Sequence, residues 1–182
     1  MAIELDRLRD RLSQGVKEEL LRQNWHSHDA RWYLKVALEC GFDIANKLNK
    51  DAAKSMGRTE MRRLLDAIGS GEVSTAEDFA KAIEIACEVY YPPPMLEGEI
   101  KVTGDDSLTC ITTKCYGFEE VRKAGGTGTY ECACGHKNEG WLEGCGLKGE
   151  VRLLKSMMRG DRACEISVSS ISPRSDDETP RD

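Results

Sequence analysis

Three consecutive prolines at positions 92–94 constrain the fold of this 182-residue chain more than any other feature. Proline donates no backbone hydrogen bond and fixes φ, so neither a helix nor a central strand continues through three of them. Before them apolar residues recur every three or four positions, and after them apolar and polar residues alternate. This change of period predicts a helical half over residues 1–91, a cysteine-rich antiparallel β half of the same domain over 92–172, and a disordered tail over 173–182.

The helical half carries start and stop signals for several helices. Apolar residues at three- and four-residue steps predict one amphipathic helix near the N-terminus, through Leu5, Leu8, Leu12, Val16 and Leu20. Serine and threonine are favoured at helix starts, and glycine follows many helix ends. We therefore expect helix boundaries at Ser27, Gly41, Gly57, Thr59 and Gly69, and a capping box between Ser74 and Glu77 at the start of the last helix.

The β half is expected to form two hairpins. The pairs are LEGEIKVT (96–103) with SLTCITTK (107–114), and EVRLLKSMM (150–158) with RACEISVSS (162–170). A short helix is predicted within 115–126, whereas the glycine-rich segment 127–149 shows no regular pattern. Helices followed by antiparallel strands indicate an α+β fold, with the N-terminal helical half packed on a C-terminal antiparallel sheet.

Charge and hydropathy exclude several classes of function. The net charge of −6 argues against a nucleic-acid-binding protein, because phosphate binding needs a concentrated positive surface. We see no uncharged apolar run long enough to cross a bilayer, and the N-terminal residues lack the apolar core of a secretory signal. We therefore expect a cytoplasmic protein that binds neither nucleic acid nor membrane.

Eight cysteines are many for a chain in a reducing compartment, where structural disulfides are not maintained. Thiolates favour soft metals, and we expect zinc or an iron–sulfur cluster, with ligands drawn from Cys110, Cys115, Cys132, Cys134, His136 and Cys145. Cys132 and Cys134 could aim both sulfurs the same way from an extended strand. The spacing lacks C-x-x-C knuckles, so an alternative is that Cys110 and Cys164 are small buried apolar residues, as Cys40 and Cys87 are expected to be.

The segment NWHSHDARW (24–32) frames a polar pair with tryptophans. On a helix, Trp25, His28, Asp29 and Trp32 share one face. In a functional interpretation His28 is a general base or metal ligand, Asp29 orients it, and the two indoles hold a flat apolar ligand. In the alternative the tryptophans pack helix against sheet and Asp29 caps a helix or forms an ion pair. The next helix offers Asn46 and Asn49 as candidate neighbours of this pair.

Two stretches resemble known families. Residues 25–49 and 57–65 resemble an uncharacterised prokaryotic family with a W-x-x-H-D-x-x-W core followed by A-N-x-L-N. RGDRACEISV (159–168) resembles the last hairpin of the L-2-amino-thiazoline-4-carboxylate hydrolase family and of four-vinyl-reductase domains. Those families are linked by fold to haem-nitric-oxide-binding and TRAPP-type domains. The resemblance implies a small-ligand-binding α+β fold, in which Cys164 matches the last cysteine of a G-D-x-x-C motif.

Three functions are compatible with these features. The first is a metal-binding protein that also binds a small molecule. The second is a hydrolase of a small heterocycle or amide, in which Cys164 or Cys134 attacks while His28 and Asp29 supply base and orienter. The third is a non-catalytic ligand-binding regulator or assembly factor, whose N-terminal leucine stripe forms the seam of a homodimer.

Overall fold

The computed structural model describes residues 12–69 and 72–175. The predicted positions Leu5 and Leu8 and residues 176–182 of the predicted tail therefore lie outside the described residues. The chain divides into two compact units, Met1–Ala45 and Asn46–Asp182. Each unit is described by itself.

The first unit consists mainly of helix α2, Gln14–Cys40. Ser13 is its N-cap, and the serine hydroxyl accepts a hydrogen bond from the Val16 amide at 3.3 Å. The helix ends at Gly41, whose φ of 86° is in the region that favours glycine, as the sequence predicts. The predicted start at Ser27 is wrong. This serine lies inside one uninterrupted helix. Residues 16–40 contain no glycine or proline that would break the helix near Ser27.

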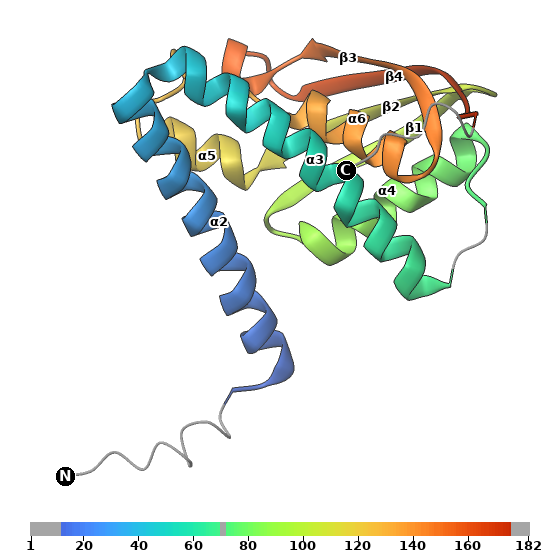
Figure 1. The fold of residues 1–182 in the computed structure, drawn as a ribbon, viewed down its shortest axis with the longest axis horizontal. Helices are drawn as coiled ribbons and strands as arrows, with labels where there is room; N and C mark the ends of the chain where they lie inside the picture. The colour runs from blue at the N-terminus through green and yellow to red at the C-terminus, as the bar shows by residue number, and fades with distance from the viewer. Residues whose placement is uncertain (1–11, 70–71, 176–182) are drawn as a thin grey trace. The chain divides into compact units, whose positions relative to one another are not determined.

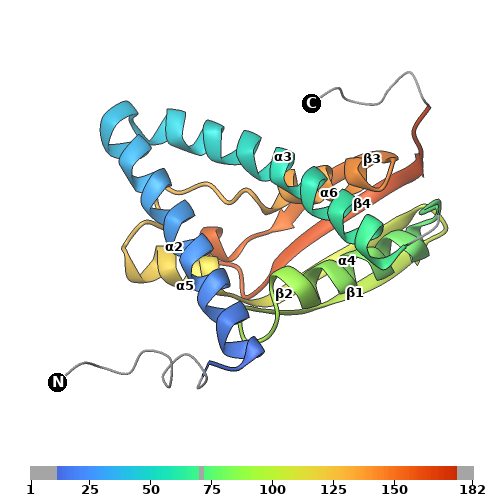
Figure 2. The same ribbon diagram turned by 60° about the horizontal axis from the view of Figure 1, so that its bottom comes forward.

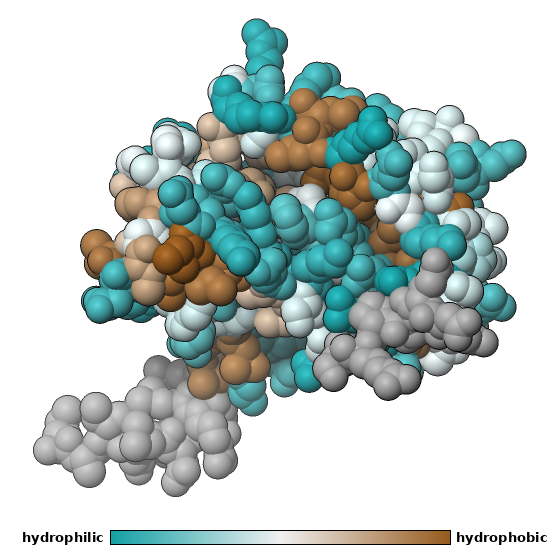
Figure 3. All heavy atoms as spheres, turned by 45° about the horizontal axis from the view of Figure 1, so that its top comes forward, coloured by the Kyte–Doolittle hydropathy of each residue, from teal (hydrophilic) through white to brown (hydrophobic). Residues whose placement is uncertain are grey.

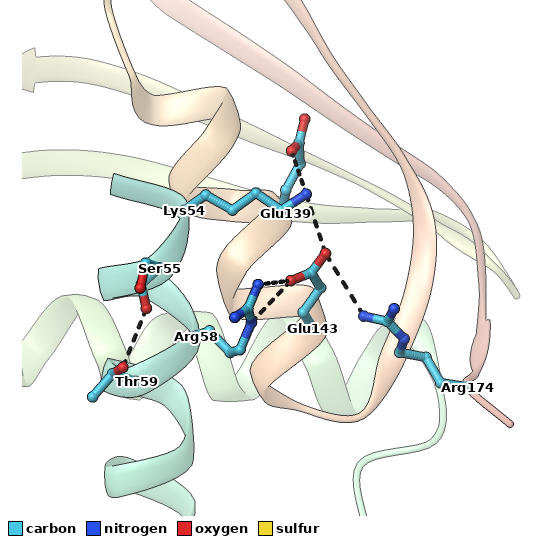
Figure 4. A network of polar contacts seen from close by, with 7 residues as sticks. All are labelled: Lys54, Ser55, Arg58, Thr59, Glu139, Glu143 and Arg174. Carbon is cyan, nitrogen blue, oxygen red and sulfur yellow. Dashed lines mark hydrogen bonds and ion pairs between the residues drawn. The ribbon is translucent and has the colours of Figure 1, made fainter. Parts of the chain in front are cut away.

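Helix α3, Phe42–Ile68, also runs on where the sequence predicts a break. A Cβ atom on Gly57 would lie 2.6 Å from the backbone oxygen of Lys137, so this glycine lets another helix approach rather than ending its own. The hydroxyl of Thr59 donates to the Ser55 carbonyl at 3.2 Å instead of capping a new helix (Figure 4). The predicted end at Gly69 is confirmed, and its φ is 60°.

Helix α4, Ala76–Tyr90, begins with a capping box one residue later than predicted. The Thr75 hydroxyl accepts the Asp78 amide at 3.1 Å, and the Asp78 carboxylate accepts the Thr75 amide at 3.2 Å. Both residue pairs fit the capping-box spacing, since serine and threonine cap alike and Glu77 and Asp78 are both acidic. The helix ends just before the three prolines, as predicted.

Four antiparallel strands form one sheet in the order β1-β2-β4-β3 (Figure 1). The two predicted hairpins are both present: β1 (Leu96–Gly104) pairs with β2 (Ser107–Cys115), and β3 (Leu147–Lys155) pairs with β4 (Cys164–Pro173). The second turn contains a short 3-10 helix, η1 (Met157–Arg159), and Gly160 at φ 92°. Strands β2 and β4 join the hairpins, with Cys110 opposite Ile166. The predicted α+β class is confirmed.

The core of the second unit lies between the sheet and helices α3, α4 and α6 (Figure 2). Its largest fully buried side chains are Met61, Phe79, Ile83, Leu108, Leu147 and Val168.

Helix α5, Tyr116–Lys123, is present as predicted. Helix α6, Cys134–Gly144, was not predicted, because glycine is unfavourable in helices and its three glycines are typical of a loop. A Cβ on Gly140 would lie 2.1 Å from the Lys54 oxygen, so glycine there permits close contact with α3. None of the helices in the described part of the chain is long and apolar enough to span a membrane.

Candidate thiol site

Four cysteines from three chain segments lie near one another in the second unit. Cys115 ends β2, Cys132 and Cys134 lie where the preceding loop enters α6, and Cys164 begins β4. The β2–β4 register pairs Thr112 with Cys164, which brings the end of one strand to the start of the other. Negative charge on Cys132, Cys115 and Cys164 contributes to raising the pKa of Cys134, so the four sulfurs are close enough to influence one another. We call these four residues the thiol cluster.

Cys132 and Cys134 contact each other directly. The Cys134 thiol donates a hydrogen bond to the Cys132 sulfur, and the Cys134 backbone amide donates a second. The two hydrogen bonds outweigh burial and lower the pKa of Cys132 to about 7. The same hydrogen bond and the charge on Cys132 raise the pKa of Cys134, so Cys132 ionises first.

The two sulfurs meet because of a turn, which corrects the expectation of an extended strand. Ala133 is the N-cap of α6 and has φ −95° and ψ 6°, a compact backbone conformation. Backbone amides at the start of a helix are free to donate to an anion, and the helix dipole favours negative charge there. The local chain direction therefore both brings the sulfurs together and stabilises a thiolate at Cys132.

The other two members of the thiol cluster, Cys115 and Cys164, have raised pKa values and ionise less readily than Cys132. Burial raises the pKa of Cys115, although the backbone amides of Phe118 and Gly117 oppose this effect. Burial also raises the pKa of Cys164, whose sulfur accepts the Met157 amide at 3.4 Å. At neutral pH Cys132 is consequently the member of the cluster that most readily carries negative charge.

Side chains of α3 hold the loop that carries Cys132. Asn46 is 3% exposed, and its amide donates to the Thr129 carbonyl at 2.8 Å while its oxygen accepts the Glu131 amide at 3.0 Å. Asn49 donates to the Tyr130 hydroxyl at 3.3 Å. These hydrogen bonds join both asparagines to the loop before the thiol cluster, and their predicted place beside His28 and Asp29 stays a prediction.

The pKa values of two other predicted metal ligands, Cys110 and Cys145, show no influence from the thiol cluster. Burial raises the pKa of Cys110 to about 12, with a contribution from charge on neighbouring Cys87, and raises that of Cys145 to about 12. His136 is partly buried in the first turn of α6. Within residues 12–69 and 72–175, no three His, Cys, Asp or Glu side chains stand in an arrangement that could hold a metal ion. All eight cysteines are free thiols.

The tryptophan-framed pair belongs to the first unit. His28 and Asp29 lie 3.7 Å apart, and their side chains are 75% and 57% exposed. Trp32 is 47% exposed, and the Trp25 ring stacks on His26 with 4.9 Å between centroids. The helix places all four predicted positions on one face, but the polar pair is open to water rather than enclosed. A joint role with the thiol cluster stays a prediction.

A charged hollow of about 490 Å³ lies beside α6 and β3. The carboxylate of Glu143 pairs with Arg58 at 2.7 Å, with Lys54 at 3.1 Å and with Arg174 at 3.7 Å, while Lys54 also reaches Glu139 at 3.1 Å (Figure 4). These ion pairs link α3, α6 and the residue that follows β4. The sequence gives no sign of the hollow, because Lys54, Glu143 and Arg174 are far apart in the chain and each resembles ordinary charged surface.

Apolar side chains also reach the surface in several separate patches between hydrophilic ones (Figure 3). In the predicted leucine stripe, Leu12, Val16 and Leu20 are 40%, 44% and 51% exposed. This exposure is compatible with a homodimer seam, which stays a prediction.

Comparison with known proteins adds one finding about the fold. No protein-family model matches the chain, and no curated protein matches it in sequence. The solved structure of a trafficking protein particle complex subunit 3 from Naegleria fowleri, covalently bound to palmitic acid, is similar to this chain with a TM-score of 0.59 and 15% identity. The match covers 89% of this chain and 100% of that subunit. The chain therefore has a TRAPP-like α+β fold, the architecture that its last hairpin led us to expect.

Proposed function

We propose that the protein is a metal-binding protein that takes up zinc at the thiol cluster and also binds a small molecule. The convergence of Cys115, Cys132, Cys134 and Cys164 from three chain segments is the observation that carries this proposal. Four cysteine sulfurs are a common ligand set for structural zinc, and zinc is borderline soft and needs no particular d-electron geometry. Cys164 thereby joins the predicted ligand set in place of Cys110 and Cys145.

The four thiols are of the donor type that zinc prefers, and metal uptake would have to bring their sulfurs closer together. Zinc–sulfur bonds of about 2.3 Å in a tetrahedron put neighbouring sulfurs about 3.8 Å apart, a separation typical of thiols that hydrogen-bond to each other. Cys132 and Cys134 make such a hydrogen bond. Metal uptake would replace this hydrogen bond by two metal–sulfur bonds and would draw the sulfurs of Cys115 and Cys164 inward. A bound ion would also displace the thiol protons, so uptake should weaken as the pH falls.

We further propose that the protein works in the cytoplasm, where its eight free thiols would stay reduced. Proteins with a TRAPP-like fold have room for an apolar ligand in at least one case, because the similar trafficking subunit is covalently bound to palmitic acid. A small apolar molecule is accordingly the ligand class that we propose for this chain.

Elemental analysis of protein purified anaerobically without added metal tests the zinc proposal. We expect about one zinc ion per chain, lost on Cys132→Ser and retained on Cys145→Ser, because Cys145 is a buried thiol outside the cluster. A visible absorption band would instead indicate an iron–sulfur cluster. Unfolding curves would establish that both variants fold. A folded protein without metal, or equal loss in both variants, would contradict the proposal.

A second function is favoured by the lowered pKa of Cys132. A thiol that ionises near neutral pH is a nucleophile, and it could attack a small heterocycle or amide. Cys132 then replaces Cys164 and Cys134 as the nucleophile that we propose. An activated acyl ester added to metal-free protein would test this idea. Mass spectrometry should find an acyl group on Cys132 that water then removes, and acylation at Cys110 alone would refute it.

A further inference from the structure

We infer that Cys132 and Cys134 form an oxidisable dithiol, which hydroperoxides convert to a disulfide and which thereby dismantles the thiol cluster. The inference concerns regulation of the site proposed above. Its contribution to metal release rests on that proposal, whereas disulfide formation does not.

The contact between the two sulfurs is the first support. The Cys134 thiol donates directly to the Cys132 sulfur, whereas Cys115 and Cys164 are linked to Cys134 only through charge. Two cysteines whose thiols are in contact are the arrangement that redox-sensitive sites use. Of the three thiols near Cys132, Cys134 is therefore placed best to complete a disulfide.

The turn at Ala133 is the second support. In an extended strand, residues two positions apart have Cα atoms about 6.6–7.2 Å apart, a range that straddles the upper limit of about 6.8 Å for a disulfide. Ala133 instead has φ −95° and ψ 6°, a compact conformation that shortens this separation. The ring can therefore close without unwinding α6, since Cys134 is only its first residue.

The reaction balances with a hydroperoxide as oxidant. The Cys132 thiolate attacks the peroxide oxygen, so that a sulfur–oxygen bond forms, the oxygen–oxygen bond breaks, and the leaving hydroxide takes up a proton to become water. The Cys134 thiol then attacks the sulfenic sulfur. A sulfur–sulfur bond forms, the sulfur–oxygen bond breaks, and a second water leaves with the thiol proton. Two thiols lose two electrons and two protons, and one hydrogen peroxide becomes two waters.

The consequence for the cluster follows from ligand number. A disulfide sulfur carries no negative charge and is a poor metal ligand, so oxidation removes two of the four donors at once. Cys115 and Cys164 alone cannot complete a tetrahedral site. A thiol reductant would restore both donors, which makes the change reversible, in contrast to oxidation of one cysteine to sulfinic acid.

Hydrogen peroxide applied to the full chain, in zinc-loaded and in chelator-treated form, tests the inference. After trapping of free thiols and proteolysis, the peptide containing residues 132–134 should weigh two hydrogens less and should regain them with a thiol reductant. In Cys134→Ser, a sulfenic-acid probe should label Cys132 instead. Cys110→Ser is the matched control, because this buried thiol lies beside Cys87 and the variant should still form the disulfide.

The outcomes separate this inference from the zinc proposal. Disulfide formation in a protein that never binds zinc would refute the zinc proposal alone. Zinc binding without the 132–134 disulfide, or a disulfide that joins either residue to Cys115 or Cys164, would overturn the inference. Unfolding curves of the oxidised protein would exclude a disulfide that forms only in unfolded chains.

Discussion

Replacement of Asn46 should loosen the loop before the thiol cluster, with an effect that depends on which half of its amide is lost. The side chain makes two hydrogen bonds to the backbone of this loop, one as donor to Thr129 and one as acceptor from Glu131. A net hydrogen bond contributes about 1 kcal/mol, and a buried backbone group without a partner costs about 1–3 kcal/mol. Thr129 and Glu131 are exposed residues, so water can reach their backbones in part.

From these values Asn46→Ala should lower the free energy of unfolding by about 2 kcal/mol. Asn49→Ala is the matched control on the same helix. It loses one longer hydrogen bond, 3.3 Å to the Tyr130 hydroxyl, and should cost about 0.5–1 kcal/mol. Urea-induced unfolding measures both changes, provided that the slope with denaturant stays constant.

Asn46→Asp makes the test sharper. The aspartate keeps an acceptor for the Glu131 amide, but it points a second carboxylate oxygen at the Thr129 carbonyl where the amide donated before. We therefore expect Asn46→Asp to destabilise the protein at least as much as Asn46→Ala, even though it removes no volume. An aspartate variant as stable as the wild type would refute the assigned geometry. In both variants the pKa of Cys132 should rise toward its ordinary value as the loop shifts.

Three further predictions test the packing and the thiol pair. Gly140→Ala should cost about 1–3 kcal/mol in urea unfolding, because its Cβ would meet the Lys54 oxygen, whereas Gly135→Ala on the same helix meets nothing within 4 Å and should not destabilise the protein. Glu60→Gln removes the carboxylate charge that pairs with the partly buried Lys137 ammonium on α6 at 3.0 Å and should cost about 3 kcal/mol, which thermal unfolding would reveal. The rate of Cys132 alkylation should rise with pH around a midpoint of about 7 instead of 9.0, and Cys134→Ala should move that midpoint upward. Because the folded pKa is lowered, the stabilisation from this thiolate is fully present above about pH 9 and is lost as the pH falls through about 7.

The sequence predicted the elements whose signals are local. Prolines at 92–94 end the last helix of the first half, Gly41 and Gly69 end two others, and both hairpins have the predicted partners. These predictions succeeded because the constraint lies in the backbone of the residue itself. The predicted helix end at Gly57 was wrong for the opposite reason. Glycine is needed there because the backbone of Lys137, eighty residues away along the chain, packs against it.

The candidate site was only partly predictable for the same reason. The sequence predicted that the sulfurs of Cys132 and Cys134 lie together, because these two cysteines are only two residues apart in the chain. The addition of Cys164 and the separation of Cys110 depend on how β2 and β4 pair, which no spacing in the chain reveals. The turn at Ala133 could not be predicted either, because the glycine-rich sequence that follows it gave no sign of a helix start.

One face of α3 connects these observations. Asn46, Asn49, Gly57 and Glu60 follow helical spacing, so within the second unit they lie along the same side of the helix. The two asparagines hold the loop before the thiol cluster, Gly57 lets α6 approach, and Glu60 accepts hydrogen bonds from Lys137 at 3.0 Å and from the Trp141 indole at 2.9 Å, both on α6.

The thiol pair lies where this loop enters α6, so α3 holds the segment on both sides of it. A loop has few backbone hydrogen bonds of its own, and side chains of α3 supply partners that secondary structure would otherwise provide. The position of the Cys132 sulfur is therefore set by packing against α3 as much as by its neighbours in sequence. It follows that substitutions on this face of α3 should alter the chemistry of Cys132 without touching a sulfur, whereas substitutions on the opposite, solvent-facing side should leave it unchanged.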